Sequence, residues 1–417
     1  MISVIAVAAV GGSAAYLLWS DGEQSSDTIK IGVCADIDNF MGKAIWQGAI
    51  LAAEQENAEG GVLGRKIEIV AEDDDSETTQ DAVVATNAFN KLITVDNADF
   101  VITSPSSSAL TYQELAAQHK KILFSPGSSG DEAAQRVVDD YDKYKYFFGS
   151  MVNNTMGLMG TVQSFVDCMD YTGFNKIGFI YENTAGSGGF VSIVIDFLVA
   201  NGFEIVYTGE VPLDTVDFSS YFAQAEAAGA EIVYPLIYGT AGIPFVKEYY
   251  DRQSPTVLWG FIIMAQLGDF WAVTEGRCEH TTNNGYPIVA GYPYTNKTLP
   301  TREAYFERWN EEITSSAATA YDIVRFVIPD AIERAGTTET AATIDTLETV
   351  NIETSVKRNF EFTSSHEIMI RGWESGLVCM FQWQDGVQVP VWPKKIMEEA
   401  GASFTFPEWA GPWDDLN

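Results

Sequence analysis

IKIGVCA, residues 29–35, opens the stretch that decides the fold of this chain. Its uninterrupted apolar run is typical of a strand buried on both faces, and residues 42–58 after it carry apolar side chains at helical spacing. The turn GGVLGRK (60–66) supplies glycines, which readily adopt positive φ, just past the helix. A second apolar strand, 66–71, ends in the acidic run 72–75. A strand, a helix and a second strand of these lengths predict two parallel strands joined by a right-handed crossover.

Strand and helix patterns keep alternating beyond this first unit. The apolar runs predict further strands at 99–103, 121–125, 146–151, 176–181, 203–208, 231–235, 256–261, 360–363, 377–384 and 387–391. The helical periodicity predicts helices at 78–92, 108–119, 154–171, 188–201, 217–227, 240–252, 301–313, 317–335 and 340–350, with Pro329 interrupting the long one. This alternation is typical of an α/β protein with doubly wound parallel sheets.

A chain of 417 residues is too long for one ordinary core, so we expect two lobes. Segments near residues 150, 290 and 360 would carry the chain between the lobes and form a hinge that permits closure. We assign residues 1–26 to a signal or membrane anchor with its linker, 27–148 plus about 292–357 to lobe 1, and 149–291 plus about 358–417 to lobe 2.

The charge of the chain is strongly one-sided. Its 58 acidic and 24 basic residues give a formal net charge of −34. Such a surface repels nucleic acid and anionic lipid, so we expect no nucleic-acid partner. The acidity indicates a heavily hydrated surface suited to a salty or exposed environment.

The N-terminus holds the one segment of the sequence with the composition of a membrane span. Residues 2–19 are apolar or small and uncharged, which is about the minimum length for a bilayer span. No basic residue precedes them, so a signal peptide and an uncleaved anchor both fit, as does a buried core helix. Either of the first two places residues 27–417 outside the cell, at the cell surface or in the periplasm. We therefore expect an extracytoplasmic protein, secreted or anchored to the membrane through this segment.

Cysteine, histidine and acidic residues predict no metal site and no cofactor. Four cysteines are too few for a disulfide framework, although a single bridge between Cys278 and Cys379 stays open. The three histidines are far apart, and the run Asp73–Asp75 lacks the alternating spacing of a calcium loop. No nucleophile, base and orienting residue occur in an enzyme motif, so we expect no catalysis.

Two serine-rich turns are the strongest indication of a binding site. Ser104–Ser108 follows one predicted strand and Ser125–Ser129 follows the next. Hydroxyls and backbone N–H groups at the start of a helix favour an anion, and ligands of open α/β sheets bind at the carboxyl ends of strands. Serine is also a common helix N-cap, so a purely structural role remains an alternative.

The first unit also carries a resemblance to a known family. IKIGV (29–33) and GAILAAEQENAEGGVLGRKIEIVAEDDDS (48–76) closely resemble the opening of the type I periplasmic solute-binding proteins of ABC transporters, in the branched-chain amino acid (leucine/isoleucine/valine) class. The resemblance implies two lobes that close on a small ligand. It also implies that the two serine turns hold the ligand's carboxylate and that a tyrosine of the other lobe contacts the ligand. Matched residue by residue, the resemblance implies Ser107, Gly127, Ser129 and Tyr238 as ligand-binding residues. To these we add Ser108 and Ser128 of the same turns, Ser187 of the turn before a helix of the other lobe, and Phe40 and Met41, the nearest in position in the first loop.

Three positions depart from the family pattern. The loop ADIDNFMG (35–42) lacks the usual Gly-Pro and tyrosine, and Ala185 stands where an aromatic residue is common. Ile262 stands where amino-acid binders place a carboxylate for the α-ammonium group, and burying an unpaired ammonium costs on the order of 3 to 5 kcal/mol. The ligand is then an amino acid whose charge is met elsewhere, by Asp269, Glu182 or Asp36, or it is a carboxylate, an amide or another small polar molecule.

The sequence thus predicts the extracytoplasmic substrate-binding component of an ABC importer, with a small-molecule ligand and a membrane permease as partners. We expect the serine turns of lobe 1 to bind first and closure to bring Tyr238 and Ser187 onto the ligand. The alternative is a ligand-sensing extracellular domain that acts with a separate signalling receptor.

Overall fold

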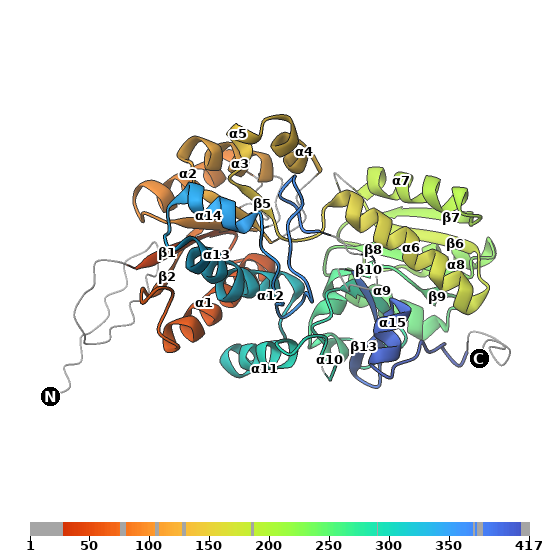
Figure 1. Cartoon of the computed structure of the whole chain (residues 1–417). Coiled ribbons are helices and arrows are strands. Elements are labelled where there is room, and N and C mark those ends of the chain that lie inside the picture. The colour runs from red at the N-terminus through yellow and green to blue at the C-terminus, as the bar shows by residue number, and fades with distance from the viewer. Residues whose placement is uncertain are drawn as a thin grey trace, which may run out of the picture.

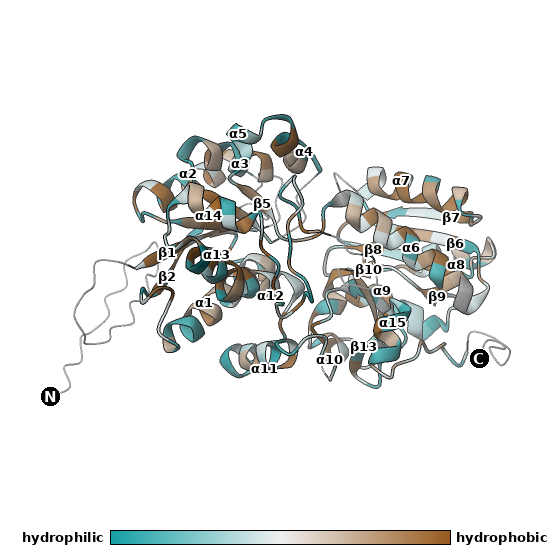
Figure 2. Ribbon diagram, in the orientation of Figure 1, coloured by the Kyte–Doolittle hydropathy of each residue, from teal (hydrophilic) through white to brown (hydrophobic). Residues whose placement is uncertain are grey.

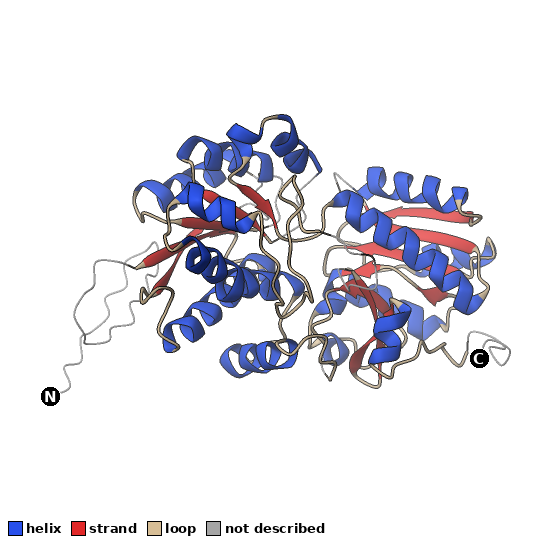
Figure 3. Cartoon of the chain, viewed as in Figure 1, coloured by secondary structure: helices blue, strands red, loops and turns tan. Residues whose placement is uncertain are grey.

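The computed structural model has two α/β lobes side by side, joined by several chain segments (Figure 1). It describes residues 28–75, 81–104, 108–126, 131–184, 187–289, 291–369, 372 and 378–409. In each lobe helices flank a sheet (Figure 3). The predicted fold class is confirmed.

Lobe 1 is built on a parallel sheet of five strands in the order β2-β1-β3-β4-β5. The strands are β1 (Ile29–Ala35), β2 (Ile67–Asp73), β3 (Phe100–Thr103), β4 (Ile122–Ser125) and β5 (Phe147–Gly149). The helices between them are α1 (Phe40–Ala58), α2 (Ala82–Thr94), α3 (Ala109–His119), α4 (Asp131–Asp139) and α5 (Tyr141–Tyr144). Every residue of β3 and β4 is buried, as expected for parallel strands covered on both faces.

Helix α1 shows why the opening stretch folds as it does. The side chain of Asn39 accepts a hydrogen bond from the backbone N–H of Met41 at 3.4 Å and so caps the helix. After the helix, Gly60 and Gly61 have φ of 119° and 76°, which glycine adopts without strain. A Cβ on Gly48 would lie 2.3 Å from the carbonyl oxygen of Ala317, so α1 packs backbone to backbone on a later helix.

Lobe 2 has a second parallel sheet, in the order β10-β8-β6-β7 with β9 beside β8. Its strands are β6 (Lys176–Glu182), β7 (Glu204–Val211), β8 (Ile232–Ile237), β9 (Val257–Leu258) and β10 (Phe261–Ile262), and its helices are α6 (Asn154–Thr172), α7 (Ser187–Ala200), α8 (Ser219–Ala227) and α9 (Gly242–Arg252). The single strand predicted at 256–261 is therefore two short strands. A Cβ on Gly260 would lie 2.5 Å from the carbonyl oxygen of Pro235, so the chain bends around β8 at that glycine.

A small antiparallel sheet, β11-β12-β13, completes lobe 2. It consists of β11 (Thr282–Gly285), β12 (Cys379–Gln384) and β13 (Val387–Trp392), and the short helices near it are η1 (Ile263–Gln266), α10 (Phe270–Val273) and α15 (Lys394–Glu399). The hairpin β12–β13 was predicted, but β11 was not, because Thr282 pairs with Gln382, which is far away in sequence. The strand predicted at 360–363 is reduced to isolated bridges.

The chain returns to lobe 1 through a set of helices. They are α11 (Thr298–Trp309), α12 (Ser315–Asp322), the π-helical turn η2 (Ile323–Val327), α13 (Ile328–Ala335) and α14 (Thr340–Leu347). The sequence predicted that Pro329 interrupts a long helix. In the structure the interruption is the π-helical turn η2, which ends just before the proline. Proline has no N–H to donate and its ring crowds the preceding turn, so the helix loosens there without ending.

The hydrophobic core of lobe 1 reaches into the crossing segments. Tyr286, Phe360, Phe362 and Ile368 all belong to this core, so residues 360–368 pack with lobe 1. In Figure 2, β1 is hydrophobic along most of its length, whereas α11 on the outside alternates hydrophobic and hydrophilic residues. The division of the chain between independently folding lobes stays a prediction.

The cysteine bridge left open by the sequence is absent. Cys278 and Cys379 are not bonded to each other, and both are buried, in separate hydrophobic clusters. The apolar segment 2–19 lies outside the described residues, so its role stays a prediction. Among the helices of the described ranges, none has the length and apolar character of a membrane span.

Candidate functional site

The carboxyl ends of strands from both lobes border the space between the lobes. Helices α4 and α7, which follow β4 and β6, begin on the sides of the lobes that face each other (Figure 1). Thr155 at the start of α6 donates from its backbone N–H and its hydroxyl to the Asp131 carboxylate, at 3.1 and 2.6 Å. The backbone N–H of Ser150 donates to the carbonyl of Ser125 at 2.9 Å. These bonds fix the first crossing segment against the edge of the lobe 1 sheet.

The serine turns are only partly described. Ser104 and Ser108, which flank the first turn, are 1% and 3% exposed. The other predicted residues of these turns, Ser107, Gly127, Ser128 and Ser129, lie outside the described residues. The carboxylate-binding role of the serine turns therefore stays a prediction.

The first loop of lobe 1 lies at the same edge. Phe40 is the first residue of α1 and is 42% exposed, and Met41 beside it is half-buried. The carboxylate of Asp36 accepts from the backbone N–H of Asn39 at 3.2 Å and is 1% exposed. Asp36 therefore braces its own loop, whereas Phe40 presents an apolar surface that a ligand could contact.

In lobe 2 the two predicted ligand-binding residues differ in their exposure to solvent. Tyr238 directly follows β8, and it is 40% exposed with its ring 5.3 Å from that of Phe261. Ser187 is 1% exposed, and its backbone N–H and hydroxyl hydrogen-bond to the hydroxyl of Thr184. Tyr238 is thus accessible to a ligand, while Ser187 closes the turn before α7.

A buried carboxylate holds the Tyr238 turn. Glu182 at the end of β6 is fully buried, and its Oε2 accepts from the backbone N–H groups of Tyr238 and Gly239 at 2.7 and 3.0 Å. Burial raises the pKa of Glu182, and the two backbone bonds oppose that rise. Within the described part of the chain, Oε1 has no hydrogen-bond partner. The sequence offered Glu182 as a source of charge but did not predict that it orients Tyr238.

Two further positions of lobe 2 bear on the charge that an ammonium group would need: Ile262, where amino-acid binders place a carboxylate, and Asp269, a proposed alternative source of that charge. Ile262 is completely buried in the core, and its backbone N–H donates to Oδ1 of Asn283 at 3.0 Å. It therefore cannot replace a carboxylate. Asp269 is exposed just before α10.

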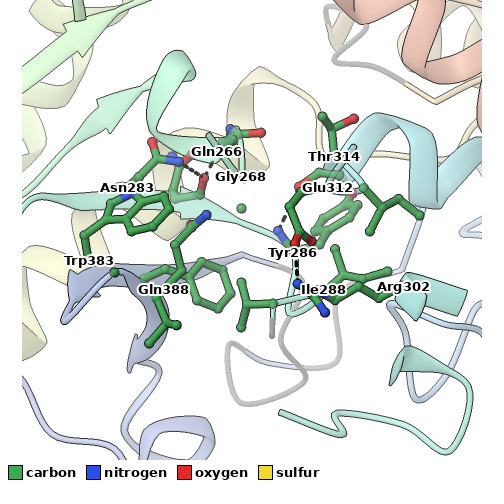
Figure 4. Close-up of a pocket in the computed structure, with 18 residues that line it drawn as sticks. Gln266, Gly268, Asn283, Tyr286, Ile288, Arg302, Glu312, Thr314, Trp383 and Gln388 are labelled. Atoms are coloured by element: carbon green, nitrogen blue, oxygen red, sulfur yellow. Dashed lines mark hydrogen bonds and ion pairs between the residues drawn. The ribbon is translucent and has the colours of Figure 1, made fainter. Parts of the chain in front are cut away.

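A cavity of about 140 Å³ lies where both lobes meet the crossing segments (Figure 4). It is lined by residues of the segments 266–268, 283–289, 312–315 and 381–388, together with Arg302 of α11. We call this cavity the hinge pocket. The sequence did not predict it, because its walls come from segments that are separated by up to about a hundred residues and that meet only in the folded chain.

The hinge pocket is rich in amides and poor in free charge. Arg302 and Glu312 form an ion pair with each other at one end of it. Trp383 is at the other end, and its indole N–H donates to the carbonyl of Ala265 at 3.0 Å (Figure 4). Such a site can hold a small polar molecule between the lobes. Among the described residues no cluster of side chains is arranged to hold a metal ion.

A second buried carboxyl lies in the hinge itself. Glu367 is 2% exposed, and its Oε2 accepts from the side-chain amide of Asn153. The backbone around it pairs with β5, since Gly149 N–H donates to His366 at 2.8 Å and Ile368 N–H donates to Gly149 at 2.9 Å. Burial, reinforced by the charge of Asp131, raises the pKa of Glu367 to about 7.

Comparison with known proteins identifies the family. The sequence matches the model of the periplasmic binding proteins over residues 28–377. The chain belongs to this family. The family resemblance inferred from the first strand, helix and strand is thereby confirmed.

The proteins that resemble this periplasmic binding protein include solved solute-binding proteins of transporters. A Leu/Ile/Val-binding protein homolog 7 of Brucella abortus (strain 2308) is 24% identical over 370 residues, covering 85% of this chain and 88% of the relative. The solved substrate-binding protein LivJ of Streptococcus pneumoniae, in complex with isoleucine, superimposes with a TM-score of 0.69 at 18% identity, covering 87% of this chain and all of that one. A solute-binding protein of R. palustris in complex with benzoate has a TM-score of 0.69 at 17% identity, covering 87% and 95%.

Proposed function

We propose that this chain is the extracytoplasmic substrate-binding component of an ABC importer and that it captures a small polar solute between its lobes. The observation that carries the proposal is the hinge pocket, whose walls come from lobe 1, lobe 2 and the crossing segments together. A solute that touches both lobes at once binds best when they are close, so it favours closure. A permease can then distinguish the loaded, closed form from the empty one.

The ligand class follows from the relatives and from the site. The solved neighbours hold isoleucine or benzoate, and both are small molecules with a carboxylate and an apolar body. Phe40 and Tyr238 offer exposed aromatic surface for such a body, one from each lobe. Ile262 gives no charge for an ammonium group. We therefore propose a small organic acid, amide or amino acid with an apolar side chain.

The proposal includes the location of the protein. The family implies that the binding lobes act outside the cytoplasm. The apolar segment 2–19 would serve as a signal or as an anchor that keeps the lobes near the permease.

A ligand screen on the full chain tests the function. Thermal shifts would be measured with amino acids, amides and aliphatic and aromatic carboxylates, because a ligand at 100 times its dissociation constant adds about 2.7 kcal/mol to the free energy of unfolding. We expect at least one class to raise the melting temperature. Tyr238→Ala should then weaken the binding of that ligand about tenfold, while Phe306→Ala, at a comparably exposed aromatic residue of α11, should not. No stabilisation by any class would contradict the proposal.

A further inference from the structure

The side chains that line the hinge pocket offer hydrogen bonds but no net charge. Arg302 and Glu312 are the charged residues of its lining, and they neutralise each other. This is unusual in a chain whose formal net charge is −34. A charged group that left water for this pocket would meet no free opposite charge, and burying an unpaired charge costs several kcal/mol. The pocket therefore favours an uncharged ligand group.

Two glutamine side chains of the lining offer hydrogen-bonding groups to a ligand. Gln266 donates one N–H to the carbonyl of Asn284 at 3.3 Å, which leaves its carbonyl oxygen and its second N–H for a ligand. The amide of Gln388 makes no hydrogen bond within the described part of the chain. Figure 4 shows Gln266 and Gln388 on opposite walls of the pocket. Each can give one hydrogen bond and accept another, which is the pattern that a primary amide presents in return.

Part of the remaining wall is aromatic, and part of it is polar. Phe381 and Trp383 are 2% and 3% exposed and lie side by side on β12. Asn283 holds its place by accepting from Ile262 N–H and donating to the Asn284 carbonyl, both at 3.0 Å. A volume of about 140 Å³ suits a ring, since apolar cavities of about 150 Å³ admit benzene.

We propose that the hinge pocket receives an uncharged amide carried on a small apolar or aromatic body, with Gln266 and Gln388 as its hydrogen-bonding partners. This inference rests on the proposed function and specifies its substrate class: the transported solute is an amide. Because the pocket joins the two lobes, the amide end of the solute holds them at a fixed angle.

Calorimetry with three ligands of nearly equal shape tests the inference on the full chain. Benzamide, benzoate and benzylammonium differ mainly in charge, at zero, minus one and plus one. We expect benzamide to bind at least about tenfold more tightly than either ion, because only the ions leave water with an unpaired charge. Equal or tighter binding of benzoate or benzylammonium, or no binding of benzamide, would overturn the proposal.

Variants show whether the binding occurs in this pocket. The double variant Gln266→Leu/Gln388→Leu should bind benzamide at least about tenfold more weakly. Gln224→Leu is the matched control, since Gln224 is exposed on α8 and its side-chain amide donates to the carbonyl of Ser220 in the same helix at 3.0 Å. Gln388→Glu gives a second test that does not depend on the folding of the leucine variants. A carboxylate at this position should shift the binding preference from benzamide toward benzylammonium. Unchanged benzamide affinity in the double variant would overturn the proposal.

The outcome separates this inference from the proposed function. If benzamide fails but another solute class stabilises the chain and depends on Tyr238, the solute-binding role stands and the amide assignment is wrong. If no solute of any class binds, both are wrong.

Discussion

At the scale of single residues, the structure gives buried carboxyl groups specific tasks. Glu182 satisfies two backbone N–H groups of the Tyr238 turn, which would otherwise be left without partners. Its position at a strand end was visible in the sequence, because the strand itself is strongly apolar. Its partners were not, since Tyr238 is 56 residues further along the chain.

Replacing Glu182 tests this positioning role. Glu182→Ala leaves two N–H groups unpaired and should lower the free energy of unfolding by about 1 to 3 kcal/mol, together with solute affinity. Glu182→Gln keeps one accepting oxygen and should recover part of both losses. Glu204→Ala, at an exposed glutamate of the same sheet, is the control. Denaturation and calorimetry measure the two effects. An unchanged affinity in Glu182→Ala would show that the Tyr238 turn does not need this carboxylate.

Glu367 predicts a dependence of stability on pH. Its pKa is raised from 4.5 to about 7 in the folded chain, so folding favours the protonated acid. The contribution of Glu367 to the free energy of unfolding is therefore fully present below about pH 4.5. It is lost as the pH rises from there to about 7, and it does not change further above that pH.

Glu367→Gln removes the titrating group and keeps its shape. The variant should be more stable than the natural chain by roughly 2 to 4 kcal/mol above pH 7, with little difference near pH 4.5. Urea denaturation across this range measures it. A constant difference between the two chains at all pH values would show that Glu367 does not titrate in this way.

At the scale of elements, the sequence pattern predicted where most strands and helices lie, but it did not predict which distant segments pair with one another. The parallel strands and their helices follow from apolar runs and helical periodicity, which are local properties, and most of them lie within a few residues of the predicted bounds. Strand β11 and the hinge pocket depend on chain segments that meet only after folding. The sequence therefore identified the family and the sheet edges but not the cavity.

The close approach of the segment after η1 to the segment before α12 shows how tightly the chain packs beside the hinge pocket. A Cβ on Gly268, after η1, would lie 2.0 Å from Cγ of Glu312, which precedes α12. Gly268→Ala should therefore force Glu312 or the lobes to move and weaken solute binding several-fold. Gly189→Ala is the control, because nothing lies within 4 Å of a Cβ at that position. Glu312→Gly removes both Cγ and Cβ of Glu312, which would lie 2.0 and 2.7 Å from the added Cβ, so combining it with Gly268→Ala should restore affinity. Failure of this rescue would contradict the role of the contact. Calorimetry provides the measurement.

At the scale of the whole molecule, the net charge of −34 opposes compact folding through self-repulsion. Salt shortens the range of this repulsion, from about 30 Å at 0.01 M to about 3 Å at 1 M. The melting temperature should rise between these concentrations by at least about 2 °C, which corresponds to roughly 2 kcal/mol for a chain of 417 residues. Sodium and potassium chloride should act alike. A fall with added salt would mean that attractive ion pairs dominate.

The central claim is that a solute draws the two lobes together. Small-angle X-ray scattering of the full chain, with and without a saturating solute from the screen, tests it most directly. The account predicts a smaller radius of gyration in the presence of the solute, because a ligand held by both lobes favours the closed form. An unchanged radius of gyration with demonstrably bound solute would contradict it.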